Sequence, residues 1–110
     1  MDSRLPAIAE QLLLIERELR AAGLWGAEVP NATALASQQP FCVDTLAFEE
    51  WLQWILLPRM KQLVEADQPL PVASGIAPMA EMAFAGRLIE LGGLLAALQA
   101  FDELLGTPPA

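Results

Sequence analysis

The 110-residue chain contains no histidine, no tyrosine and a single cysteine, Cys42. Without histidine it lacks the commonest general base and the commonest metal-ligating nitrogen. One cysteine cannot form an internal disulfide, so the fold does not depend on oxidation, and a reducing cytoplasm is the expected location. We therefore predict no catalytic residues, no metal site and no cofactor, and we expect a protein that is not an enzyme.

Basic residues are also scarce, since six lysines and arginines face fourteen acidic residues and leave a net charge of -8. The six are dispersed, whereas binding to phosphates requires a cluster of positive charge. Direct binding to RNA, DNA or an anionic membrane is therefore not expected, although the charge is compatible with a basic protein partner. Every uncharged stretch also ends before the ~20 residues that span a bilayer. The opening MDSRLPAIAEQLLLIERELR carries charge where a signal peptide would not, which is typical of a mature helix.

The N-terminal part predicts an amphipathic helix with one buried face. At about 100° per residue, its apolar residues fall within one arc of roughly 100°: Leu5, Ile8, Leu12, Ile15, Leu19 and Ala22. Ser3 is the expected N-cap, Pro6 suits the first turn, and Gly23 is the expected terminator. Leu13 and Leu14 lie outside the arc.

Two stretches lack any helical period and are expected to form long irregular crossings. Residues 24–44 contain glycine, proline, asparagine and serine, and a connection of this length is unusual inside a compact domain. Their apolar residues indicate that the segment packs across the helices, with Trp25 and Phe41 as anchors. The second stretch, DQPLPVASGIAP, contains three prolines, which favour an ordered extended crossing.

A second helix is predicted over residues 46–66. Asp44 or Thr45 is its expected N-cap, and Glu49 and Glu50 suit its positive end. Its apolar side chains spread over roughly 200° of the circumference, so the helix must contact neighbours on two sides.

Proline interrupts this second helix in its middle. Pro58 has no N–H to donate to the carbonyl of Trp54, and its ring presses on that turn, so we expect one bent helix. Arg59 follows the bend, and if it is buried its guanidinium needs a carboxylate, with Asp44 and Glu81 as candidates.

Two further helices are expected in the C-terminal part. Pro78 is expected to open a third helix through PMAEMAFAG, and a fourth is expected from Arg87 to about Leu105, with Leu88 among the apolar residues of one side. Gly92 and Gly93 weaken the fourth helix by about 1 kcal/mol each relative to alanine. They mark either a boundary or a close helix contact, and the sequence does not choose between the two.

Four helical segments without an alternating strand pattern predict a single all-α domain spanning residues 1–110. We expect a four-helix bundle with a Pro-kinked second helix and two long irregular crossings. Because 55% of the residues are hydrophobic, the chain either packs tightly alone or covers the excess on another chain. The expected state is a monomer or a weak homodimer.

The segments PFCVDTLAFEEWLQWILLPRM and QPLPVASGIAPMAEMAF resemble the YqcC-like family of small proteobacterial proteins. The resemblance covers nearly the whole chain and implies an all-α bundle of unknown biochemical function. It also implies an association, by gene neighbourhood, with tRNA pseudouridine synthase C, which makes that enzyme a candidate protein partner. The family has no defined catalytic residues, and AGRLIELGG departs from the polar turn expected there.

Several residues allow a chemical reading beside a structural one. Pseudouridine synthases depend on an aspartate nucleophile, but they are larger α/β proteins with a basic cleft, so Asp44 is better explained as a helix cap. Adjacent Glu49 and Glu50 point about 100° apart, which favours capping and solvation over paired-carboxylate chemistry. Cys42 has no histidine to activate it and is expected to be buried and inert. Trp51 and Trp54 are expected to serve the core more than an exposed interface.

The leading prediction is a small, acidic, cytoplasmic protein-interaction module, accessory to a tRNA pseudouridine synthase, that presents a surface near Pro58. The candidate surface residues are Asp44, Glu49, Glu50, Gln53, Trp54, Arg59 and Lys61. The alternative is a small-molecule-binding or catalytic protein with a pocket between the bent helix and the proline-rich crossing. That reading predicts a cavity on the order of a few hundred Å3 lined by Asp44, Arg59 or Glu81.

Overall fold

Helix α1 (Leu5–Ala21) presents one buried face, as its periodicity predicts. The computed structural model describes residues 3–71 and 75–106, and in it five of the six residues of the predicted face are buried: Leu5, Ile8, Leu12, Ile15 and Leu19. The sixth, Ala22, is partly buried just after the helix ends. Leu13 and Leu14, which lie outside the predicted arc, are exposed. The hydrophobic pattern therefore correctly predicted both the helix and the side of it that is buried.

The ends of α1 follow the sequence signals only in part. The prediction of Ser3 as N-cap is wrong, because the helix begins at Leu5 and Arg4 takes the N-cap position without a side-chain cap. Pro6 lies in the first turn, as expected. Gly23 follows the helix with a φ of 73°, the left-handed conformation that glycine adopts without strain and that ends helices.

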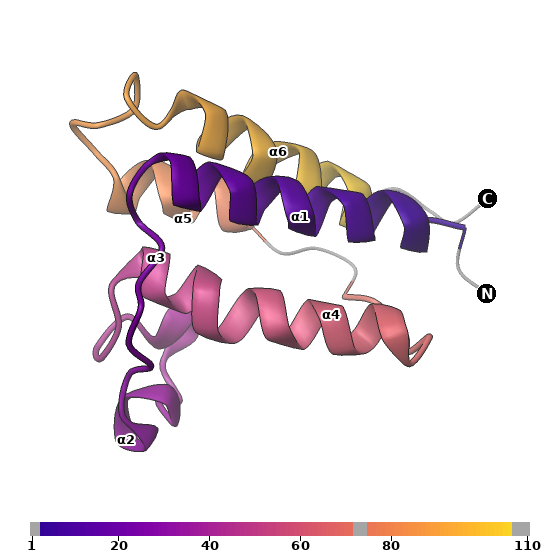
Figure 1. The fold of residues 1–110 in the computed structure, drawn as a ribbon, viewed down its shortest axis with the longest axis horizontal. Coiled ribbons are helices and arrows are strands. Elements are labelled where there is room, and N and C mark those ends of the chain that lie inside the picture. Colours follow the sequence, from indigo (N-terminus) through magenta and orange to yellow (C-terminus); the bar gives the residue numbers. More distant parts are fainter. Residues whose placement is uncertain (1–2, 72–74, 107–110) are drawn as a thin grey trace.

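Helix α6 (Gly92–Gly106) runs antiparallel to α1, and the two lie side by side in Figure 1. The Gln11 side chain donates a hydrogen bond from Nε2 to the carbonyl of Ala97 at 2.7 Å. At the end of the pair, Arg4 donates to the carbonyl of Leu105 at 3.0 Å, where a cation also suits the negative end of α6.

A continuous helical segment, which we name the central helix, lies below this pair in Figure 1. It consists of α3 (Phe48–Trp51), a π-helical turn η2 (Leu52–Leu56) and α4 (Leu57–Glu65). The Leu57 N–H donates to the carbonyl of Leu52, five residues back, and the backbone stays helical on both sides of the turn. The helix predicted over 46–66 is thus present, and the irregularity beside Pro58 takes the form of a wider turn.

The start of this segment corrects the sequence prediction. Neither Asp44 nor Thr45 is the N-cap, because the helix begins at Phe48, two residues later than predicted, and Ala47 takes the N-cap position. The Glu50 carboxylate accepts a hydrogen bond from the Ala47 N–H at 2.9 Å, so one expected acidic residue does stabilise the first turn. The Asp44 carboxylate instead accepts from the hydroxyl of Ser37, within the first crossing.

The first crossing packs against the core, as expected, and contains two short helical turns: α2 (Ala32–Leu35) and the 3-10 turn η1 (Pro40–Cys42). Trp25 and Phe41 are both partly buried against the core, so their role as anchors is confirmed. The Phe41 and Trp51 rings pack in a T-shaped arrangement, with ring centroids 4.8 Å apart. Phe48 stacks with Trp51 at 5.8 Å, which ties η1, α3 and the core into one aromatic cluster.

Helix α5 (Ile76–Ala83) begins two residues before Pro78 and ends before the predicted boundary. Its first two N–H groups, from Ile76 and Ala77, donate to the carboxylate of Asp102 on α6, at 3.1 and 2.8 Å. Part of the predicted proline-rich crossing, residues 72–74, lies outside the described residues.

The prediction that the fourth helix starts at Arg87 is wrong. The helix begins at Gly92, and residues 85–91 form turns in which Leu88 is exposed instead of buried. Both readings of the glycine pair hold, because Gly92 is the boundary and Gly93 is a close contact: a Cβ on Gly93 would collide with the carboxylate of Glu18 on α1.

The described residues form an all-α compact globule with a radius of gyration of 13.7 Å, and no strand occurs in residues 3–71 and 75–106. Helix α1 packs against both α6 and α4, and α5 packs against α6. Leu46 and Leu57 are buried as well. The largest fully buried side chains come from all these elements: Ile8, Leu12, Ile15, Leu19, Leu52, Leu57, Met60, Ile76, Leu91, Leu94, Leu98 and Phe101.

Candidate functional site

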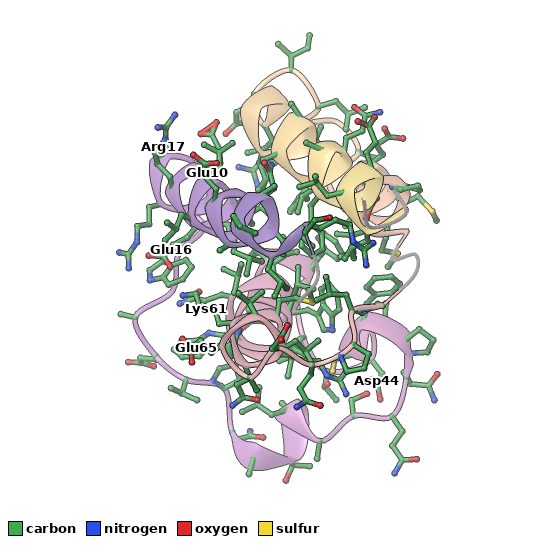
Figure 2. The ribbon with its side chains drawn as sticks, turned by 90° about the vertical axis from the view of Figure 1, so that its right-hand side faces the viewer. Glu10, Glu16, Arg17, Asp44, Lys61 and Glu65 are labelled. Carbon is green, nitrogen blue, oxygen red and sulfur yellow. The ribbon has the colours of Figure 1, made fainter. Side chains whose placement is uncertain are left out.

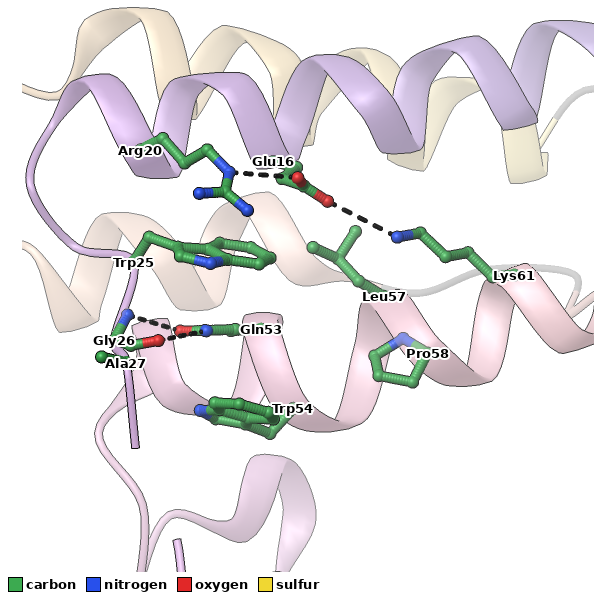
Figure 3. Close-up of a pocket in the computed structure, with 10 residues that line it drawn as sticks. All are labelled: Glu16, Arg20, Trp25, Gly26, Ala27, Gln53, Trp54, Leu57, Pro58 and Lys61. Carbon is green, nitrogen blue, oxygen red and sulfur yellow. Dashed lines mark hydrogen bonds and ion pairs between the residues drawn. The ribbon is translucent and has the colours of Figure 1, made fainter. Parts of the chain in front are cut away.

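A groove of about 460 Å3 lies beside Pro58, between α1, the chain that follows α1, and the central helix. We name it the Pro58 groove, and Figure 3 shows the side chains that line it: Glu16, Arg20, Trp25, Gly26, Ala27, Gln53, Trp54, Leu57, Pro58 and Lys61. Three of the seven predicted surface residues, Gln53, Trp54 and Lys61, therefore meet in one place.

The Gln53 side chain links two walls of the groove by hydrogen bonds. The prediction that Gln53 is a surface residue is wrong. The side chain is only 5% exposed, the one polar residue among the buried side chains of the described ranges. Its Nε2 donates to the carbonyl of Gly26 at 2.7 Å, and its Oε1 accepts from the Gly26 N–H at 2.8 Å. A buried amide needs both kinds of partner, and one residue of the first crossing supplies them.

Two tryptophans lie on opposite sides of this amide pair (Figure 3). Trp25 comes from the chain after α1 and Trp54 from the π-turn, and both are partly buried. Because the Gln53 side chain fixes Gly26, the hydrogen bonds to Gly26 also fix the position of the neighbouring Trp25. The groove is therefore an aromatic surface whose shape is set by a buried hydrogen-bonded pair.

Charged side chains form the upper edge of the groove. Glu16 accepts from Arg20 Nε at 3.1 Å and from Lys61 Nζ at 3.5 Å, which links α1 to α4. The Arg20 guanidinium also lies 4.4 Å from the centre of the Trp25 ring. The Arg20 and Lys61 side chains are 56% and 45% exposed, so each ion pair contributes only about 0–1 kcal/mol. Their role is to order the edge and not to hold the fold.

A second concavity, of about 430 Å3, lies on another side of the central helix. We name it the Phe41 pocket, and its lining comes from the first crossing including η1, the central helix, the second crossing and the start of α5: Ser37, Gln39, Pro40, Phe41, Cys42, Trp51, Ile55, Leu56, Arg59, Met60, Pro71 and Ile76. A pocket of the predicted size thus lies between the helix and the proline-rich crossing. Arg59 lines it, whereas Asp44 and Glu81 do not.

Of the four remaining predicted surface residues, Asp44, Glu49 and Glu50 line neither concavity, whereas Arg59 lines the Phe41 pocket. Asp44 is exposed and lies away from Glu16 and Lys61 in Figure 2. Glu49 and Glu50 are partly buried on α3, where Glu50 caps the helix. Arg59 is exposed, so its guanidinium does not need a buried carboxylate partner.

Sequence reasoning missed Glu16 and Arg20 as groove residues. The signal that finds them is their spacing of four, which places a Glu–Arg pair on one helix face. That spacing does not reveal that Lys61, 45 residues away from Glu16, lies opposite.

The charged side chains of the Pro58 groove, Glu16, Arg20 and Lys61, form ion pairs with one another. Over residues 3–71 and 75–106, histidine, cysteine and acidic side chains form no group of three or more that could hold a metal ion. Among the same residues, no helix is both long enough and apolar enough to cross a membrane.

The chain is similar to proteins of one known family. The DUF446 family model, described as tRNA pseudouridine synthase C, matches residues 7–104. The chain is 42% identical over 94 residues to the uncharacterised protein YqcC of Escherichia coli and 41% identical over 95 residues to an uncharacterised protein of Haemophilus influenzae, with 86% of each chain covered in both cases. The solution NMR structure of YqcC from E. coli matches with a TM-score of 0.86 at 36% identity, covering 98% of this chain and 92% of that one.

A further relative is itself an enzyme. A segment of the tRNA pseudouridine synthase C of Pectobacterium carotovorum is 42% identical to this chain over 69 residues. The match covers 63% of this chain but only 18% of the synthase.

Proposed function

The chain belongs to the YqcC-like (DUF446) family, and we propose that it is a protein-interaction module that binds a tRNA pseudouridine synthase through the Pro58 groove. The observation that carries the proposal is the P. carotovorum synthase, in which a segment similar to this chain is part of the enzyme's own polypeptide. Two modules in one chain meet at high effective concentration without needing affinity. Where the same module is a separate chain, meeting the synthase requires a binding surface.

The Pro58 groove has the features of such a surface. Tryptophan and arginine dominate the residues that carry binding energy at protein interfaces. Here Trp25, Trp54 and Arg20 line one concavity, with Pro58 and Leu57 beside them. Since the Gln53 hydrogen bonds order the groove before any partner arrives, little ordering cost remains for binding.

Charge supports the same partner. An enzyme that acts on tRNA presents a positive surface, because it must neutralise phosphates. A chain with a net charge of -8 is attracted to such a protein over long range, although it repels the nucleic acid itself. We propose that the module works in the cytoplasm as a monomer or weak homodimer, without catalytic activity and without binding tRNA on its own.

The proposal is tested by calorimetric titration of the purified chain with the synthase of the same organism. We expect a dissociation constant at or below tens of micromolar, and weaker binding as salt is added. Trp54→Ala should weaken binding by about 30-fold, the effect of losing an interface residue worth about 2 kcal/mol. The matched control is Ile89→Ala, which removes a 99% exposed apolar side chain on the loop before α6 and should leave binding unchanged.

Two outcomes contradict the proposal. If about 100 micromolar protein gives neither heat nor a complex with the synthase, the synthase is excluded as a partner, because even weak binding would be detected at that concentration. Equal weakening by Trp54→Ala and Ile89→Ala excludes the groove as the contact surface. A parallel titration with tRNA alone should give no salt-dependent binding.

A further inference from the structure

We propose that the Phe41 pocket is a binding site for a small apolar carboxylate, with the guanidinium of Arg59 contacting the carboxylate and the aromatic and aliphatic walls enclosing the apolar part. This site lies apart from the Pro58 groove and does not rest on the function proposed for it. Of the lining residues, the two concavities share none.

The size and walls of the pocket suit a small ligand. Its volume of about 430 Å3 falls in the range of small-molecule sites, about 300–1,000 Å3. Leu56, Met60 and Ile76 are buried residues of the core and form part of its lining, while Ile55 and Trp51 are partly buried beside them. An apolar group that enters the pocket therefore contacts side chains already held by the core.

The positive charge at the rim of this pocket favours an anionic ligand. Among the described residues that line the pocket, Arg59 is the only one that is formally charged at neutral pH. None of the ion pairs within residues 3–71 and 75–106 involves Arg59, and its side chain is exposed at the rim. A guanidinium presents paired N–H donors that match the two oxygens of a carboxylate. In a chain with a net charge of -8, this is a local exception to a surface that otherwise repels anions.

The wall formed by η1 has an unusual backbone. Phe41 and Cys42 are consecutive non-glycine residues with φ values of 57° and 50°, in the left-handed region. Such a conformation costs roughly 1–2 kcal/mol per residue and persists only where the surroundings hold it. Here the Cys42 N–H donates to the carbonyl of Gln39 at 3.0 Å, and the Phe41 ring packs on Trp51. This strained turn directs Phe41 and Cys42 toward the central helix, and both residues form one wall of the pocket.

The three tryptophans provide a direct test, because Trp51 lines the Phe41 pocket whereas Trp25 and Trp54 line the Pro58 groove. The indole N–H signals of the full chain, labelled with 15N, are followed by NMR during titration with octanoate. The matched neutral probe is octanol, which has the same chain length without the charge. For a ligand of this size we expect a dissociation constant of about millimolar order, with the Trp51 signal shifting and the other two unchanged.

Two variants separate charge recognition from general apolar binding. Arg59→Gln removes the exposed charge without touching the core and should weaken octanoate binding about three- to tenfold, to the level of octanol. Lys61→Gln removes the neighbouring positive charge, which lines the other concavity, and should leave octanoate binding unchanged. The proposal is overturned if octanoate fails to shift Trp51 at about 10 mM, if octanol binds the native chain as tightly as octanoate, or if both variants lose affinity equally.

Discussion

Replacing Gln53 tests how the groove is built, because two hydrogen bonds from one buried side chain hold Gly26 in place. A typical intramolecular hydrogen bond contributes about 0.5–1.5 kcal/mol, so their joint loss in Gln53→Leu should cost about 1–3 kcal/mol. A domain of this size has roughly 5–15 kcal/mol in total, and the loss should lower Tm by about 4–12 °C. The variant should still fold, with Trp25 more exposed and its fluorescence shifted to the red.

Gln53→Glu gives a more specific test, because the new side chain has nearly the same shape but carries a carboxyl group that titrates. A neutral carboxyl group can still donate to the Gly26 carbonyl and accept from the Gly26 N–H. Ionisation removes the donor and leaves a buried charge facing an oxygen, so the folded protein raises the pKa of the new carboxyl. With the folded pKa above the unfolded one, the folded state holds more protons, and stability relative to the native chain falls as pH rises through the folded pKa.

The assay is urea denaturation of the native chain, Gln53→Leu and Gln53→Glu at pH 5 and at pH 8. Both values avoid the isoelectric point near 4.2, where an uncharged protein tends to precipitate. Gln53→Glu should be clearly less stable relative to the native chain at pH 8 than at pH 5, whereas the deficit of Gln53→Leu should be the same at both. A deficit below about 0.5 kcal/mol for both variants, or one for Gln53→Glu that does not depend on pH, would refute the reasoning.

Three further predictions concern the rest of the fold. Leu52→Ala empties a fully buried position where the π-turn begins and should cost about 2–5 kcal/mol in urea denaturation, whereas a loss below 1 kcal/mol would mean that the turn is not held by the core. Asp102→Ala removes the acceptor for the first N–H groups of α5 and should cost about 0.5–2 kcal/mol, with faster hydrogen exchange in α5; exposed Glu81→Ala is the control that should do neither. The Arg87 side chain lowers the pKa of Glu90 by hydrogen bonding and by its charge, so this pair stabilises the loop above the ordinary carboxyl pKa and stops doing so as pH falls through the lowered one. An NMR titration of the Glu90 carboxyl should give a higher pKa in Arg87→Ala, and an unchanged value would contradict the assignment.

The parts of the fold that depend on neighbours in sequence were predictable. The face of α1 follows from its 3.6-residue period, and its end follows from Gly23. The two-sided apolar pattern of the central helix correctly required contacts on two sides, which it makes with α1 and with Phe41 of η1. Trp25 and Phe41 were recognisable as anchors because large aromatic residues in an irregular segment need burial.

The parts that depend on distant partners were not predictable from pattern. Asp44 has good capping propensity, yet its carboxylate accepts a hydrogen bond from the Ser37 hydroxyl within the first crossing, and the helix begins only at Phe48. Gln53 looked like a surface residue because its partner, Gly26, is 27 residues away. Asp102 caps a helix other than its own, and no local signal marks such a cap.

The fourth helix shows the limit of periodicity itself. Leu88 fits the apolar side of the pattern, but the residues before Gly92 form turns in which Arg87 bonds Glu90, and the helix begins only at the glycine pair. Periodicity reports which residues share a side if a helix forms, and it does not report where the helix starts.

The central claim is that the Pro58 groove is the surface that contacts a tRNA pseudouridine synthase. Hydrogen–deuterium exchange of the full chain, with and without the synthase, measures it directly. The account predicts slower exchange in residues 24–27 and 53–61 on adding the synthase, and unchanged exchange in residues 76–83 of α5. No protection anywhere, or protection confined to α5 and the loop before α6, would contradict it.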